Sequence, residues 1–104
     1  MTRYTSGRNQ EYRIKKLLEN GGAYLVTRSA GSHGQADLVA FFYHATFCVQ
    51  VKRAKPSAKE HELVREASAN TACKWAMVWS NGKEIRTWTY QRGKPSKLPV
   101  PGLS

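Results

Sequence analysis

The chain has 104 residues, enough for one small domain with a modest hydrophobic core and too few for a second domain to be expected. Seventeen Lys and Arg oppose seven Asp and Glu, and the formal net charge of +10 favours a polyanionic partner such as nucleic acid, with an anionic membrane surface as the competitor. No apolar run approaches the roughly 20 residues that span a bilayer, and the N-terminal residues lack the apolar stretch of a signal peptide. A soluble, cytoplasmic protein with no membrane partner is therefore expected.

Apolar periodicity predicts two helices. Ile14, Leu17 and Leu18 recur at helical spacing before Gly21-Gly22, a pair that stops a helix. The second segment follows a Pro-Ser break and is acidic near its start, as the helix dipole prefers. The expected helices are Arg8–Asn20 and Ala58 to about Ala72.

Five strands are predicted from β-branched and aromatic runs bounded by turn residues. In the third, alternation places Gln50 and Lys52 on one face, and Asn81-Gly82 marks a tight hairpin turn between the last two. The expected strands are Ala23–Arg28, Ala36–Tyr43, Thr46–Arg53, Lys74–Trp79 and Glu84–Tyr90.

The residues from Arg92 onward contain three prolines, two glycines and several basic side chains, without periodicity. Little core is expected there, so the prediction is a domain over residues 1–91 and a flexible basic tail over residues 92–104. The element order α-β-β-β-α-β-β describes an α/β sandwich, in which helices flank a small central mixed sheet.

Asp37 is the only aspartate, and it heads an apolar strand just after the glycine-rich segment Ser29–Gln35. A carboxylate there can hold a divalent cation, while a nearby ammonium group, Lys52, steadies the charge that develops at phosphorus. Glu11 falls on the helix face that turns toward the sheet, where a carboxylate needs a partner. Taken singly, Asp37 is more simply a turn residue and Glu11 a solvated helix residue or a partner of Lys52.

Two residue types are open to more than one interpretation. Cys48 and Cys73 have neither the spacing of a metal knuckle nor that of a disulfide framework, so buried free thiols are expected. Trp79 and Trp88 could stack on unpaired bases, although a role in the core or in a dimer interface is favoured because aromatic residues dominate both.

Four segments together resemble the archaeal-type Holliday junction resolvases, which also occur in viruses and belong to the PD-(D/E)xK nuclease superfamily. The resemblance covers the first half of the chain by motif and the remainder by order of elements only. Each motif is weak alone, and their joint occurrence in this order carries the resemblance. The segments are Arg8-Asn9-Gln10-Glu11, Arg28-Ser29-Ala30-Gly31-Ser32, Asp37-Leu38-Val39-Ala40 and Gln50-Val51-Lys52.

The resemblance implies a restriction-endonuclease-like fold and a Mg²⁺-dependent endonuclease, with Mn²⁺ expected to substitute. By this resemblance Asp37 is a direct metal ligand, Gln50 a second or water-mediated ligand, and the carbonyl of Val51 a third. Glu11 would hold metal-bound water or a second ion, and Lys52 would orient the nucleophile or stabilise the charge on phosphorus.

A loop serine contributes to activity in that family, and Ser32 matches its position, so its hydroxyl is expected to bind the scissile phosphate. Arg8 and Arg28 match basic positions that contact the DNA backbone, and Arg53 and Lys55 extend the same patch. In isolation each of these residues is an ordinary loop or surface residue, and Gln50 and Lys52 are the solvent face of a half-buried strand.

One departure from the family pattern is Gln50, where Glu is usual. A glutamine still offers an amide oxygen to Mg²⁺, but the site loses one negative charge, so a higher metal requirement is predicted. The leading expectation is a homodimer that resolves four-way DNA junctions by paired symmetric nicks. The alternatives are a restriction-type or repair endonuclease acting on duplex DNA, and a catalytically inactive DNA-binding module.

Overall fold

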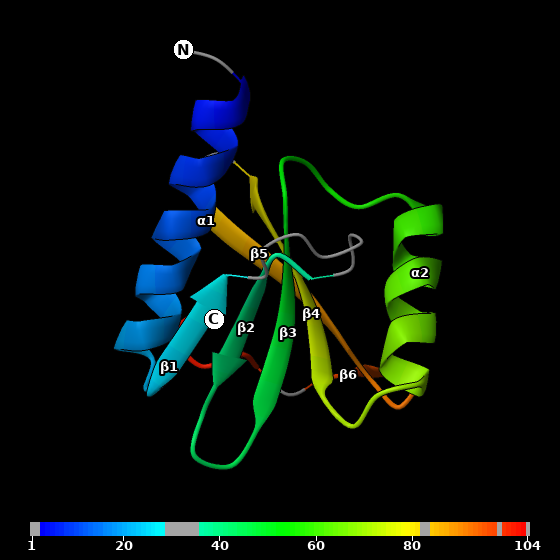
Figure 1. Ribbon diagram of the computed structural model, residues 1–104. Coiled ribbons are helices and arrows are strands. Elements are labelled where there is room, and N and C mark those ends of the chain that lie inside the picture. Colours follow the sequence, from blue (N-terminus) through cyan, green and yellow to red (C-terminus); the bar gives the residue numbers. More distant parts are fainter. Residues whose placement is uncertain (1–2, 29–35, 82–83, 98, 104) are drawn as a thin grey trace.

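The computed structural model describes residues 3–28, 36–81, 84–97 and 99–103 (Figure 1). Their elements follow the predicted order and add a sixth strand at the C-terminal end. The two helices are α1 (Arg3–Asn20) and α2 (Ala58–Ala69). The strands are β1 (Leu25–Arg28), β2 (Leu38–Phe41), β3 (Thr46–Lys52), β4 (Lys74–Asn81), β5 (Glu84–Gln91) and β6 (Lys94–Ser96).

The strands form one six-stranded sheet in the order β1-β2-β3-β4-β5-β6. Neighbouring strands are antiparallel except β3 and β4, which run parallel because α2 carries the chain back between them. The sheet is therefore mixed, and the predicted α/β fold with flanking helices is confirmed.

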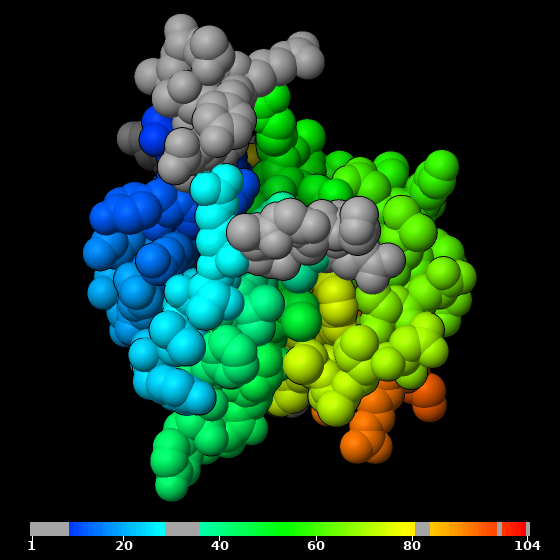
Figure 2. Space-filling view, in the orientation of Figure 1, coloured from blue at the N-terminus to red at the C-terminus, as the bar shows by residue number. Residues whose placement is uncertain are grey.

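The two helices cover opposite faces of the sheet (Figure 1). Alternation along β4 shows this directly, since Ala76 and Val78 join the core cluster that contains Ile14 and Leu18 of α1, whereas Met77 joins the cluster that contains α2 residues. In the space-filling view, α1 and α2 lie on either side of surface formed by strand residues (Figure 2).

The second helix ends earlier than predicted because polar side chains take up its last carbonyl groups. The Asn70 amide donates to the Glu66 carbonyl at 2.9 Å, and the Thr71 hydroxyl donates to the Ala67 carbonyl at 3.2 Å. At the other end, Ser57 and Glu60 form a capping box, in which each side chain accepts a hydrogen bond from the backbone N–H of the other. The helix is thus bounded by side-chain hydrogen bonds at both ends.

The prediction that residues after Arg92 contribute little core is wrong. Strand β6 pairs with β5, and Val100 and Leu103 are 0% and 5% exposed within the core beside α1. Gly102 adopts a φ of +93°, and a Cβ at this position would overlap the carbonyl oxygen of Leu17. The described C-terminal residues therefore belong to the same packed domain as the rest of the chain.

Cys48 and Cys73 are both free, as predicted, and each is half-buried rather than fully buried. Burial is the main cause that raises the pKa of the Cys48 thiol to about 12, and the neighbouring Cys73 raises it further. Cys48 is therefore a neutral thiol at physiological pH.

Neither described helix has the length and apolar character needed to cross a lipid bilayer.

Candidate active site

Asp37 lies immediately before β2 and is fixed against β3 by two hydrogen bonds. Its backbone N–H donates to the Val49 carbonyl at 2.9 Å, and its Oδ2 accepts from the Val51 N–H at 2.8 Å. A turn residue would bond to its own neighbours in sequence, whereas Asp37 bonds to a strand 14 positions away. The carboxylate is therefore tied to β3 and lies at the end of a strand pair.

Gln50 and Lys52 share a face of β3, as the alternation predicted. Val49 of β3 is buried in the core beside α1, so its neighbours Gln50 and Lys52, on the alternate face, point to the side that carries α2. Gln50 is 8% exposed, which shows that this strand face is not simply a solvent face. Asp37, Gln50 and Lys52 are thus brought together at one end of β3.

Val51 contributes to this cluster through its backbone. The Val51 N–H donates to Asp37 Oδ2. The role predicted from the sequence was a different one, with the Val51 carbonyl as a metal ligand. A hydrogen bond from a backbone N–H favours the ionised carboxylate and fixes its orientation. Val51 therefore orients Asp37.

Lys52 is paired with Glu60, a residue for which the sequence predicted no role in the site. Its Nζ lies 2.6 Å from Oε2 of Glu60, the third residue of α2. The hydrogen bond from Lys52 and that from the Ser57 backbone lower the pKa of the Glu60 carboxyl to about 2. The Ser-x-x-Glu capping box after β3 was the sequence signal that could have placed Glu60 at the start of α2, close to the end of that strand.

Glu11 turns toward the sheet, as predicted, but its partner is Arg28 rather than Lys52. Glu11 Oε1 lies 3.2 Å from Arg28 Nε, and the Glu11 side chain is 23% exposed. Both residues line a hollow of about 220 Å³ together with Leu38, which follows Asp37 directly. The Glu11 carboxylate is therefore on the α1 side of the strand pair that holds Asp37.

A further contact ties α1 to the end of β3. The side-chain amide of Gln10 donates to the Lys52 carbonyl at 3.0 Å. Gln10 belongs to the first of the motifs that carry the family resemblance, although no role was predicted for it. This hydrogen bond fixes the backbone of Lys52 relative to the helix that carries Glu11.

The remaining predicted site residues are less closely gathered. Arg53 and Lys55 are exposed on the segment between β3 and α2, and Arg28 is held by Glu11 at the end of β1. Arg8 lies in α1, but its side chain falls outside the described residues, and so does the whole of Ser32.

The side chains near Asp37 fit a divalent cation in part. Within the described ranges, no three His, Cys, Asp or Glu side chains are grouped as a metal site. Mg²⁺, however, is usually held by one or two carboxylates, with water and substrate phosphate oxygens completing its octahedron. Asp37 with the Gln50 amide oxygen is a donor set of the right chemistry for such a partly solvated ion.

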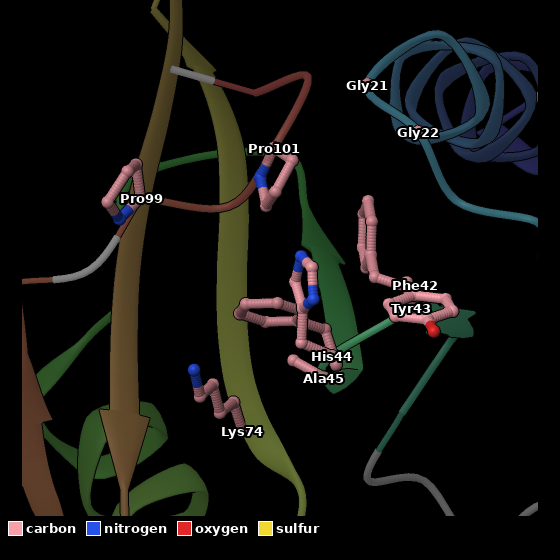
Figure 3. A pocket seen from close by; sticks show the side chains of 10 residues that line it. Gly21, Gly22, Phe42, Tyr43, His44, Ala45, Lys74, Pro99 and Pro101 are labelled. Atoms are coloured by element: carbon pink, nitrogen blue, oxygen red, sulfur yellow. The ribbon is translucent and has the colours of Figure 1, made fainter.

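Two larger hollows lie away from these residues. One of about 330 Å³ is lined by the aromatic rings of the β2–β3 turn, by Lys74 and by two C-terminal prolines (Figure 3). The other, of about 440 Å³, lies between β5 and the segment that follows β6. Neither contains a predicted catalytic residue.

Comparison with known proteins finds no match to any family model, curated protein or solved structure.

Proposed function

We propose that the protein is a metal-dependent DNA endonuclease that acts on four-way junctions, as its resemblance to the archaeal-type resolvases of the PD-(D/E)xK superfamily implies. The observation that carries the proposal is the position of Asp37. A hydrogen bond from the Val51 N–H ties its carboxylate to β3, where Gln50 and Lys52 flank Val51, 13 and 15 positions further along the chain than Asp37. Asp37 and Lys52 match residue types of the family motif at the ends of two adjacent strands, and Gln50 stands where the family usually has Glu.

In this proposal each side chain has a distinct task. Asp37 and the Gln50 amide oxygen would hold Mg²⁺, which supplies Lewis acidity and lowers the pKa of bound water when it is present. Lys52 places a positive charge where negative charge develops on the phosphoryl oxygens. Glu11, on the α1 side of the strand pair, pairs with Arg28 in the hollow of about 220 Å³ that both residues line, where a guanidinium can contact a phosphate.

DNA as the partner is supported by the formal charge of +10. Arg53 and Lys55 are exposed directly after β3 and would extend the cationic surface from the proposed catalytic residues. Contacts of this kind read the path of the phosphate backbone rather than base sequence. A homodimer is proposed as well, because paired cuts in two opposed strands need two active sites related by a two-fold axis.

Linear duplex DNA is the main alternative substrate. Some related restriction-type nucleases have glutamine at the position of the usual glutamate. Gln50 is therefore the one feature that favours a duplex nuclease. A catalytically inactive DNA-binding module is the second alternative.

Cleavage of a labelled four-way junction and of a linear duplex of the same sequence, both with Mg²⁺, tests the proposal. Symmetric paired nicks in the junction and a largely intact duplex are expected. Equal cleavage of the two substrates would contradict junction specificity and indicate a duplex nuclease. Binding to the junction without nicking at any Mg²⁺ or Mn²⁺ concentration would indicate the inactive module.

A further inference from the structure

Trp88 on β5 is an exposed aromatic ring that is held in place from one side. It is 45% exposed, and the His61 ring of α2 meets it edge to face, with centroids 5.3 Å apart at 89°. His61 is itself fixed, since its Nδ1 lies 3.0 Å from the hydroxyl of Tyr90, which is 6% exposed. The His61 and Tyr90 rings thus hold an indole that still presents a large part of its surface to solvent.

The strand register places Trp88 in line with the proposed catalytic residues. Gln50 pairs with Met77 across β3 and β4, and Met77 pairs with Trp88 across β4 and β5. Residues paired in register point to the same face of a sheet. Because adjacent strands are about 4.8 Å apart, the Cα atoms of Gln50 and Trp88 are separated by roughly 10 Å.

The adjacent row across the same strands is cationic at both ends. Lys52 pairs with Trp79, and Trp79 pairs with Arg86, so a half-buried indole lies between an ammonium and a guanidinium group. Both cations are paired with carboxylates, Lys52 with Glu60 at 2.6 Å and Arg86 with Glu84 at 2.7 Å, which offsets part of the charge of each. The row from Lys52 through Trp79 to Arg86 therefore combines an aromatic ring with cationic side chains, and Trp88 lies two residues from Arg86 on the same face of β5. Met77, between Gln50 and Trp88, is buried beside α2.

That combination suits a nucleic-acid strand with an unpaired base. A cationic groove with aromatic rings binds single strands, since phosphates meet the cations and a base can stack on a ring only when it is free of its own helix. A protein partner would also cover an exposed indole, but the formal charge of +10 favours a polyanion.

We propose that Trp88 is a stacking platform for an unpaired nucleobase of DNA, about one or two nucleotides from the phosphate that faces Lys52. This proposal rests on the proposed function, which places the cleaved phosphate of the DNA strand at Lys52. It adds a feature of the substrate, namely unpaired bases beside the cleavage point. Bulges and flaps supply such bases, and a four-way junction supplies them where base pairs at its branch point open, whereas a perfect duplex does not.

Binding without metal tests this proposal separately from catalysis. Fluorescence anisotropy in EDTA would compare a duplex that carries a two-nucleotide bulge with a perfect duplex of the same length. Wild-type protein is expected to prefer the bulged DNA. Trp88→Ala should weaken binding of the bulged DNA roughly 5- to 100-fold and leave binding of the perfect duplex unchanged, while Trp88→Phe should retain part of the preference.

Tyr43→Ala is the matched control, because Tyr43 is another exposed aromatic residue, at 92%, in the β2–β3 turn and outside the register row of Trp88. It should leave the preference for bulged DNA intact. An equal loss in Trp88→Ala and Tyr43→Ala, or no loss in Trp88→Ala, would overturn the proposal. A Trp88→Ala protein with unchanged DNA binding and a smaller mass by light scattering would also overturn it and assign the ring to a protein interface.

The two proposals can fail independently. If the wild-type protein cuts no DNA, but its preference for bulged DNA disappears in Trp88→Ala, the nuclease proposal is refuted and the stacking proposal stands. A protein that nicks junctions but binds bulged and perfect duplexes alike would refute the platform alone.

Discussion

The ammonium group of Lys52 lies 2.6 Å from the carboxylate of Glu60, and this pair joins the end of β3 to the first turn of α2. The capping box with Ser57 fixes Glu60 in turn. The two side chains are 24% and 36% exposed, so solvent screens part of their attraction and the pair contributes only modestly to stability. Its main consequence is the placement of the Lys52 charge.

Glu60→Gln should therefore affect catalysis more than folding. The amide keeps an oxygen for the capping box and loses the charge that holds Lys52, so we expect the cleavage rate to fall about tenfold, or ~1.4 kcal/mol. Junction affinity should not weaken, since the change removes a negative charge. Single-turnover cleavage and anisotropy measure the two effects.

Glu62→Gln is the matched control, because Glu62 lies on the same helix but is paired with Arg65 and not with Lys52. Its cleavage rate should equal that of the wild type. Equal rates for Glu60→Gln and wild type would show that Lys52 does not depend on Glu60 for its position.

The Glu60 pair also predicts how stability responds to acid. The folded-state pKa of Glu60 is lowered from 4.5 to about 2, chiefly by the hydrogen bond from Lys52. Its contribution is therefore fully present above about pH 4.5 and is lost as the pH falls toward 2. Denaturant unfolding between pH 6 and pH 2.5 should show a smaller loss of stability for Glu60→Gln than for wild type. Parallel curves would contradict the pairing.

The C-terminal turn should be sensitive to a single methyl group. Gly102→Ala would force a side chain into the left-handed region and against the Leu17 carbonyl, and we expect it to cost ~2–4 kcal/mol of unfolding free energy. Gly22 also has a positive φ, of +112°, but a Cβ there meets nothing within 4 Å. Gly22→Ala should therefore cost only ~1 kcal/mol. Similar melting temperatures for the two variants would contradict the close approach of the C-terminal turn to α1.

The glutamine at position 50 predicts a change in metal requirement. Gln50→Glu would add a carboxylate beside Asp37, so we expect half-maximal cleavage at a lower Mg²⁺ concentration than in wild type. Titrating Mg²⁺ for both proteins on the same junction measures this shift. Superimposable curves would show that residue 50 does not contribute to the metal site.

Sequence patterns predicted the elements whose periodicity is regular. The apolar spacing of Ile14 and Leu18 located α1, and the alternation of β3 placed Gln50 and Lys52 on one face. Both depend on local geometry, which repeats at 3.6 residues in a helix and at two in a strand.

Contacts that depend on tertiary structure were not predictable in the same way. Val100 and Leu103 are isolated apolar residues among prolines and glycine, so nothing periodic marks them as core. The ion-pair partners of Lys52 and Glu11 were likewise not predicted, because which residue each one pairs with depends on how a helix packs beside a strand. Periodicity in the sequence therefore locates helices and strands, whereas side-chain pairs between two elements can be identified only once the fold is known.

The most direct test of the central claim is nicking of a labelled four-way junction with Mg²⁺ by wild type and by Asp37→Asn. Asparagine keeps an oxygen that can accept from the Val51 N–H, so the strand pair should stay intact and circular dichroism should confirm folding. We expect symmetric nicks from wild type and loss of cleavage by at least about a hundredfold, or ~2.7 kcal/mol, in a folded Asp37→Asn protein that still binds the junction. Nicking at the wild-type rate by Asp37→Asn would contradict an active site centred on Asp37.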